Sequence, residues 1–275
     1  MGNVARIFFF FLFPVLLVGL AQADDWQALA PGLELREFVI SNLEGDTLES
    51  QGSLAVLRID LTRFDLVLGA ALKTGRSLPM PEWVRQHGFV AAINAAMFRA
   101  DDRLRSTGFM RDNKVVVNSF MHPDYGAFLV FQPLDPSLPA VRWVDRKQDD
   151  DWQDILAKYN GVIQNYRLIS RDRQNLWEPT LRRHSVAAVA MDQQDRLFFI
   201  HSRPPLSLHE FAQALLDLPL NLVGAMYVEG GADAAMYVQV NNFTGRWVGE
   251  YQTDFFQSSN KHFWPAPNVL GLRLK

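Results

Sequence analysis

Short apolar runs of strand length recur along the chain, and several of them alternate with polar positions. Apolar runs of about four to eight residues, bounded by turn-forming residues, are typical of buried or half-buried β-strands. The expected strands are residues 54–61, 64–68, 89–93, 114–117, 127–131, 186–191, 197–201 and 269–274. The polar segment 192–195 joins two of these runs with the length of a hairpin connection.

Helical periodicity occurs in fewer places. Residues 152–159 carry apolar side chains at i, i+3, i+4 and i+7 behind three aspartates. Residues 207–218 begin with the spacing of a capping box, and Pro81 opens a possible short helix to Gln86. The proline-rich segment 132–139 is interpreted as a loop within one domain, because apolar patterning resumes after it. The sequence therefore predicts a single-domain α+β fold with a mixed or antiparallel β-sheet core and a few flanking helices.

The first 23 residues have the pattern of a secretory signal peptide. A short apolar run follows Arg6 and ends in Ala21-Gln22-Ala23, so cleavage is expected before Asp24. The apolar run is shorter than a membrane-spanning helix requires. Residues 24–275 are then the mature domain, in the periplasm or secreted, with no stable membrane span after cleavage. An uncleaved N-terminal anchor is the alternative.

Charge and cysteine content exclude several classes of function. Without residues 1–23 the chain has 26 Lys and Arg against 30 Asp and Glu, a net charge of −4. That balance is unlike the basic surface of a nucleic-acid-binding protein. The sequence has no cysteine, which excludes thiol catalysis and cysteine-ligated metals.

The segment Tyr227–Val238 is the most informative stretch of the sequence. Two apolar, strand-like runs are interrupted by Glu229, Gly230, Gly231 and Asp233. An unpaired carboxylate is costly to bury in a core strand, and a glycine pair permits positive φ and a close approach to the backbone. Acids at a glycine turn between strands indicate a functional site, although a solvent-facing hairpin turn would have the same local sequence.

Three other positions carry candidate chemistry. Asn94 ends an expected strand, where its amide can bind a substrate hydroxyl or close an Asx-turn. Arg183 precedes an expected strand and can pair with Glu229, grip an anionic substrate or face solvent. His184-Ser185 lacks the glycine-flanked elbow of a serine hydrolase. No histidines have metal-binding spacing, and His201, in an apolar run, is interpreted as a core histidine.

Taken together, these blocks resemble the phosphodiester glycosidase family in their order along the chain. The matching blocks are Asn94–Phe98, Gly108–Val116, Arg183-His184-Ser185, the helix 207–218 and the segment 225–236, with Arg167-Leu168-Ile169 as a looser match. The chain departs from the family pattern in three places, one of which is the replacement of the usual serine after the glycines around Asp233. Asn-Gly-Gly is replaced by Asn94-Ala95-Ala96, and Asp-Gly-Gly by Glu229-Gly230-Gly231.

The resemblance implies a secreted hydrolase that cleaves a sugar-1-phosphodiester at the glycosidic bond, without a cofactor or metal. It implies Glu229 as nucleophile or general base, Asp233 as second carboxylate and Arg183 as phosphate clamp. Asn94 would orient a sugar hydroxyl, and His184 would be an acid or a supporting group. The backbone amides of Gly230 and Gly231, together with Arg167 and Thr107, would contact the carbohydrate phosphodiester.

Two other functions remain open at this point. A non-catalytic protein on the same scaffold would bind a cell-envelope glycan or an anionic polymer, and the loss of the Asn-Gly-Gly glycines favours it. A metal-dependent phosphodiesterase would instead cleave at phosphorus. Sensitivity to a chelator distinguishes that activity from a glycosidase.

Overall fold

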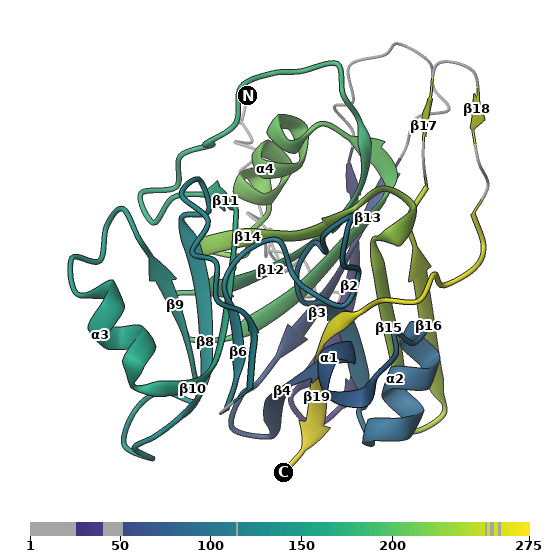
Figure 1. Ribbon diagram of the computed structural model, residues 1–275. Helices are drawn as coiled ribbons and strands as arrows, with labels where there is room; N and C mark the ends of the chain where they lie inside the picture. Colours follow the sequence, from purple (N-terminus) through teal and green to yellow (C-terminus); the bar gives the residue numbers. More distant parts are fainter. Residues whose placement is uncertain (1–25, 41–51, 114, 251, 254–255, 258–259) are drawn as a thin grey trace, which may run out of the picture.

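The computed structural model describes residues 26–40, 52–113, 115–250, 252–253, 256–257 and 260–275 (Figure 1). The expected signal peptide, residues 1–23, lies outside this part of the chain. Three β-sheets and a two-stranded ribbon form the framework of the structure, and the strand pairs in the described residues are antiparallel. The α+β expectation fits broadly, but the protein is dominated by antiparallel sheet.

The largest sheet has seven strands. In spatial order they are β1 (Gln27–Ala30), β2 (Leu33–Ile40), β3 (Gly52–Ile59), β13 (Leu197–Leu206), β12 (His184–Asp192), β14 (Leu222–Gly230) and β11 (Arg167–Ile169). The short connection Asp192–Asp195 joins β12 to β13 as a hairpin, as expected from the sequence.

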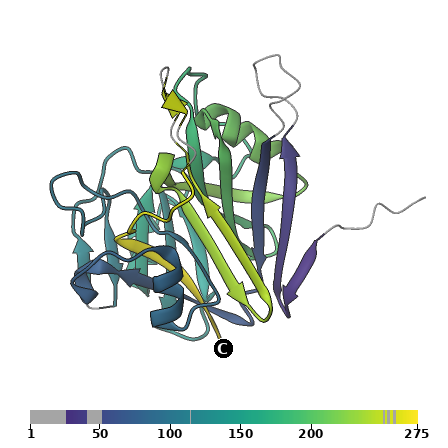
Figure 2. The same ribbon diagram turned by 90° about the vertical axis from the view of Figure 1, so that its right-hand side faces the viewer.

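Two five-stranded sheets complete the main body. One comprises β7 (Val115–Asn118), β6 (Met110–Asp112), β10 (Tyr159–Asn165), β8 (Ala127–Pro133) and β9 (Val141–Asp145). The other comprises β16 (Phe243–Val248), β15 (Ala235–Val240), β5 (Ala91–Asn94), β19 (Asn268–Leu274) and β4 (Phe64–Ala70). The ribbon pairs β17 (Gln252–Thr253) with β18 (Phe256–Gln257). In Figure 2, β15 and β16 lie between the purple edge of the seven-stranded sheet and the blue helix α2.

Each sheet has one face against a central core and one face covered by a helix. The helices are α1 (Ala71–Thr74), α2 (Met80–His87), α3 (Trp152–Ala157) and α4 (Leu208–Asp217). Helix α4 packs on the seven-stranded sheet, α2 on the sheet of β15 and β5, and α3 on the sheet of β8 and β9 (Figure 1). At 10 residues, α4 is the longest helix in the described residues, and a membrane-spanning helix needs about 20.

Period-two alternation explains this arrangement. Along β12, Val186, Ala188 and Ala190 belong to the cluster under α4, whereas Ala187, Val189 and Met191 belong to the central core. Successive strand residues face opposite sides of a sheet, so a continuous apolar run fits a strand buried on both faces. The α4 capping box is present as expected, but α3 ends at Ala157, and Tyr159 begins β10 instead of continuing the helix.

Candidate active site

Glu229 lies one residue before the end of β14, at an irregularity in the sheet. Ala187 of β12 is opposite Glu229 and the next residue, Ala188, is opposite Tyr227, so Val228 is an extra residue in β14. Such a bulge redirects the side chains that follow it. Because Ala187 faces the central core, the bulge turns Glu229 toward that core and away from the face of Tyr227.

The carboxyl group of Glu229 is buried and poorly satisfied. The residue is 7% exposed, Oε1 accepts a hydrogen bond from the Gly230 amide at 3.0 Å, and Oε2 has no hydrogen-bond partner among the described residues. Burial raises the pKa of Glu229 to about 8, and the nearby charge of Asp233 acts in the same direction, against the Gly230 amide and Arg103. At neutral pH this carboxyl group therefore holds its proton.

Asp233 provides a second carboxylate in a different environment. It ends the 3₁₀ turn η1 (Gly231–Asp233), and its side chain is 33% exposed. A guanidinium nitrogen of Arg103 lies 3.9 Å from Asp233 Oδ1. Partial burial raises the pKa of Asp233, and the charge of Arg103 opposes the shift. Arg103 was not among the candidate residues expected from the sequence, although it belongs to the polar stretch that follows the Asn94 block.

The two glycines are required for different reasons. Gly231 has φ of +65°, a left-handed conformation that favours glycine. Gly230 is extended, but a Cβ there would collide with the Tyr227 hydroxyl and the His184 ring. The expectation that both amides face a substrate does not hold for Gly230, because its N–H donates to Glu229.

Asn94 holds the backbone of this turn instead of presenting its amide to a ligand. Its Nδ2 donates to the Asp233 carbonyl at 3.1 Å, and its Oδ1 accepts from the Ala235 amide at 2.7 Å. The residue is 2% exposed. Asn94 thus fixes the turn from β5 through both ends of its amide, and its contact with a sugar hydroxyl stays a prediction.

An aromatic hollow of about 360 Å³ opens beside Gly230. We define the aromatic hollow by its lining residues, which are Met97, Tyr125, Tyr166, Trp177, Thr180, Arg182, His184, Leu208 and Tyr227. The rings of Tyr125 and Tyr166 meet edge to face at 4.4 Å between centroids, and those of Tyr166 and Trp177 at 5.4 Å. The Tyr125 hydroxyl donates to Thr107 Oγ1 at 3.0 Å, which places Thr107 behind the hollow.

His184 lines this hollow as a neutral imidazole. Its Nδ1 lies 2.9 Å from the Ser185 carbonyl oxygen, so the ring proton lies on Nδ1 and Nε2 is left as an acceptor. Desolvation lowers the pKa of His184, and the charge of Arg182 acts in the same direction. The structure therefore places the His184 ring beside Gly230, and its role as an acid or a supporting group stays a prediction.

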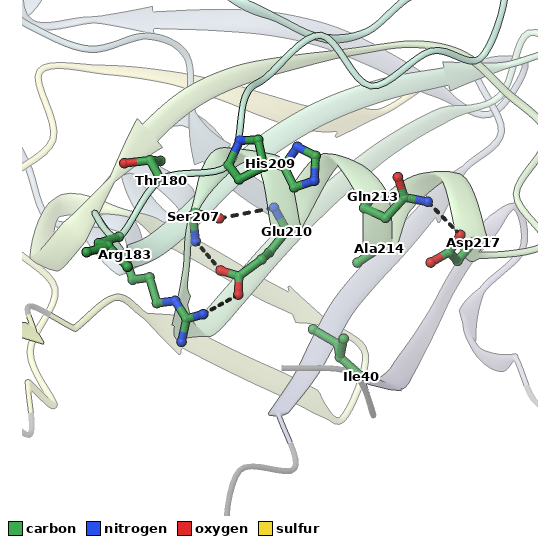
Figure 3. A pocket seen from close by; sticks show the side chains of 11 residues that line it. Ile40, Thr180, Arg183, Ser207, His209, Glu210, Gln213, Ala214 and Asp217 are labelled. Carbon is green, nitrogen blue, oxygen red and sulfur yellow. Dashed lines mark hydrogen bonds and ion pairs between the residues drawn. The ribbon is translucent and has the colours of Figure 1, made fainter. Parts of the chain in front are cut away.

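Arg183 lies elsewhere, in a second hollow of about 380 Å³ beside α4. Its Nη2 is 2.5 Å from Glu210 Oε1, and Glu210 also accepts from the Ser207 amide in the α4 capping box (Figure 3). The expected pairing of Arg183 with Glu229 or a phosphate is not what this geometry provides. In the extended segment 181–184, even-numbered residues line the aromatic hollow and odd-numbered residues line the α4 hollow, so Arg182 takes the position expected for Arg183.

Arg167 is also engaged within the protein. Its Nη1 lies 3.0 Å from both carboxylate oxygens of Asp145, which is fully buried. The Arg167 carbonyl accepts from Trp177 Nε1 at 2.9 Å. Arg167 therefore supports the wall of the aromatic hollow, and the expectation that it contacts substrate does not fit. Within the described residues, no group of three His, Cys, Asp or Glu side chains is placed to hold a metal ion.

Comparison with known protein families identifies the fold and its lineage. The model of the phosphodiester glycosidase family matches residues 87–273, which include Asn94, Arg103, the aromatic hollow and the Glu229 turn. The chain belongs to the phosphodiester glycosidase family. No curated protein matches the sequence.

Two solved structures show the same fold as this phosphodiester glycosidase family member. The catalytic domain of zebrafish N-acetylglucosamine-1-phosphodiester alpha-N-acetylglucosaminidase, auto-inhibited by its pro-peptide, aligns with a TM-score of 0.64. The identity is 13%, and the alignment covers 90% of this chain and 86% of that domain. A hypothetical protein from Synechocystis aligns with a TM-score of 0.56 at 12% identity, over 89% of this chain and 62% of that one.

Proposed function

We propose that this protein hydrolyses a sugar-1-phosphodiester at the glycosidic bond. The observation that carries the proposal is the buried carboxyl group of Glu229, unpaired at Oε2 and electrostatically coupled to a second carboxylate, Asp233, in the adjoining turn. A pair of carboxyl groups in unlike environments is the basic requirement for glycosidic hydrolysis.

The environments of the two acids suggest distinct roles. Glu229 is protonated at neutral pH, so it is suited to donate a proton rather than to act as the nucleophile or base expected from the sequence. Asp233, which faces Arg103, is suited to accept a proton from the attacking water. This assignment uses the same two residues and reverses the expectation for Glu229.

The proposed reaction balances as follows. The bond between the anomeric carbon and the bridging oxygen breaks, and its electron pair goes to the phosphate. Glu229 transfers its proton to the departing bridging oxygen and becomes a carboxylate, so the phosphate monoester leaves with one negative charge instead of two. Water attacks the anomeric carbon and gives its proton to Asp233. The products are the free sugar and a phosphate monoester, and the two carboxyl groups return to their starting states by exchange with solvent.

The aromatic hollow supports a carbohydrate substrate. The rings of Tyr125, Tyr166, Trp177 and Tyr227 provide apolar faces for the C–H surfaces of a sugar, together with polar tips for hydroxyl groups. Arg182, in the lining, and Arg103, beside Asp233, are the candidates for holding the phosphate. They replace Arg183 in that role.

The expected signal peptide supports a location outside the cytoplasm. We propose export to the periplasm or beyond, where a carbohydrate phosphodiester or a cell-envelope glycan would be the partner. The balance of charges offers no basic surface for nucleic acid.

A non-catalytic glycan-binding protein is the second candidate, and one observation favours it. Glu229 Oε2 has almost no solvent exposure, and Asn94 is occupied by backbone groups. A binding protein would need the aromatic hollow alone, without access to the Glu229 carboxyl group.

Turnover of a panel of sugar-1-phosphodiesters distinguishes the two functions. We expect the purified protein to release free sugar, and Glu229→Gln to lower kcat by about 100-fold or more, the usual range for general acid–base groups. Glu82→Gln is the matched control, because Glu82 lies on α2 away from the site, and it should retain full activity. Glycan binding without turnover by the wild-type protein would support the binding function instead.

A further inference from the structure

His201 is a buried, titratable residue that the proposed reaction does not use. It lies on β13 with 0% exposure, opposite Ala187 on one side and Ala55 on the other. Both alanines belong to the central core, so the imidazole faces that core. Its only polar contact in the described residues is from Nε2 to the Ala234 carbonyl oxygen at 3.2 Å, and Nδ1 has no hydrogen-bond partner.

His201 and Glu229 occupy the same row across the seven-stranded sheet. His201 is opposite Ala187, and Ala187 is opposite Glu229, so the three residues lie on three adjacent strands. Ala187, with a single methyl group as its side chain, lies between the two titratable residues in this row. The turn η1 packs over β12 in this region and brings the Ala234 carbonyl to the imidazole.

The backbone after the turn is held from two sheets. Asn94, on β5, bonds the Asp233 carbonyl and the Ala235 amide, and His201, on β13, contacts the carbonyl of Ala234 between them. Ala234 also accepts a hydrogen bond from the Gly249 amide at 2.7 Å. Contacts from both the sheet of β5 and the seven-stranded sheet therefore set the position of Asp233 relative to Glu229.

We propose that His201 is a positioning residue that fixes the Asp233 turn against Glu229 by donating its Nε2 proton to the Ala234 carbonyl. The inference rests on the proposed function for its catalytic consequence. The role explains why an imidazole is found among apolar neighbours. An apolar side chain at this position would avoid the cost of a buried nitrogen without a hydrogen-bond partner, so packing alone does not account for a histidine.

The protonation state of His201 is consistent with this role. Burial lowers the pKa of His201 to about 4, and the charge of Arg203 acts in the same direction, against the Ala234 carbonyl. The ring is therefore neutral near pH 7 and carries one proton. With that proton on Nε2, the contact with Ala234 is a hydrogen bond and the bare Nδ1 lies in the core.

Two amide substitutions test the position of the donor. The amide nitrogen of Gln reaches about as far as Nε2 of histidine, whereas that of Asn reaches only as far as Nδ1. We expect His201→Gln to keep kcat within threefold of wild type, and His201→Asn to lower it at least tenfold with KM within threefold. Val189→Ala, a buried core change on β12, is the control for loss of stability alone and should not lower kcat.

A second readout separates this inference from the proposed function. Carbon-13 NMR titration of the Glu229 carboxyl group should give the same pKa in His201→Gln as in wild type, and a shift of at least 0.5 in His201→Asn. That shift would support the positioning role even if the wild-type protein turned over no substrate, which would contradict only the proposed function. Equal kcat and equal Glu229 titration in the Gln and Asn variants would overturn the inference.

Discussion

At the scale of single residues, Glu229 and Asp233 have very different environments. Glu229 is buried, with one oxygen unpaired in the part of the chain that the structure describes, whereas Asp233, only two-thirds buried, faces Arg103. A buried ionised carboxylate without a cation partner is unfavourable, and the group responds by keeping its proton. A residue that served packing alone would not need a carboxyl group in this place.

The first prediction concerns stability as a function of pH. The pKa of Glu229 is about 8 in the folded protein and near its ordinary value of about 4.5 when unfolded, so the unfolded state binds fewer protons between these values. The contribution of Glu229 to the free energy of unfolding should therefore fall by about a few kcal/mol as pH rises from about 5 to 8. Buried histidines such as His201, whose pKa is lowered, act in the opposite direction in both proteins, so the prediction concerns the difference between wild type and a Glu229 variant. Glu229→Gln is always neutral and should remove most of that fall.

Melting temperatures of wild type and Glu229→Gln across this pH range provide the measurement. The two curves should diverge toward alkaline pH, with the variant more stable. Parallel curves would mean that Glu229 is ionised in the folded protein at neutral pH, and its role as proton donor would be lost.

The second prediction compares three arginines. Arg182→Ala and Arg103→Ala should each lower kcat/KM about tenfold or more, because these cations lie at the aromatic hollow and beside Asp233. Arg183→Ala should instead lower the free energy of unfolding by about 1 kcal/mol, as a partly exposed ion pair with Glu210 is lost. Steady-state kinetics and denaturant titration of the three variants provide the measurement. A loss of kcat/KM in Arg183→Ala, with none in Arg182→Ala or Arg103→Ala, would contradict the prediction.

At the scale of elements, the decisive piece is the turn η1 after β14. Its conformation depends on the positive φ of Gly231 and on backbone contacts from β5 and β13. The bulge at Val228 places Glu229 on the core side of the sheet immediately before this turn. Local backbone geometry therefore brings together two acids that are four residues apart in sequence.

The third prediction uses two glycines with the same backbone angle. Gly231 and Gly88 both have φ of +65°, but Gly88 is the C-cap residue that follows α2, away from the site. Substitution of either glycine by alanine should cost about 1 kcal/mol of stability through strain in the left-handed region. Only Gly231→Ala should also lower kcat, which activity assays at matched stability would reveal. Equal kcat in both variants would show that the turn does not set catalytic geometry.

Local signals in the sequence predicted many elements correctly. The capping box of α4, the hairpin at Asp192 and the strand runs that became β3, β8 and β12 depend on neighbours close in sequence. The predicted end of the helix at residue 159 was wrong. Tyr159 continues the helical spacing of apolar residues, but in the structure it belongs to β10 and pairs with a residue of β8. Pairing between distant segments is not visible in local periodicity.

The candidate site was predicted in part. The segment of Glu229 and Asp233 was found because acids beside paired glycines are unusual in an apolar run. Arg183 was predicted as the phosphate clamp, whereas Arg182 is the arginine that lines the aromatic hollow. Adjacent residues of an extended segment face opposite sides, so an error of one position selects the wrong side chain. Tyr125, Tyr166 and Trp177 were missed because tertiary structure alone brings them together.

At the scale of the whole molecule, the site lies where three sheets meet. Glu229 and His201 come from the seven-stranded sheet, and Asn94 comes from the sheet of β5 and β15. Thr107 and Tyr125 precede strands of the third sheet, β6 and β8. The inner faces of all three sheets share one core, so the positions of these residues depend on the packing of the entire domain.

This arrangement explains how family membership and low sequence identity coexist. Replacement of Asn-Gly-Gly by Asn94-Ala95-Ala96 is tolerated here because Ala95 and Ala96 are buried, and neither has the positive φ that would favour glycine. The zebrafish catalytic domain shares the fold at 13% identity. The chemistry must therefore be established on this chain itself.

Hydrolysis in water labelled with oxygen-18 tests the central claim most directly. Wild-type protein acting on a sugar-1-phosphodiester should place the label in the sugar, sampled before exchange at the anomeric carbon, and leave the phosphate monoester unlabelled. Glu229→Gln should form neither product at a comparable rate. Label in the phosphate would mean cleavage at phosphorus, and it would contradict the glycosidase mechanism proposed for Glu229 and Asp233.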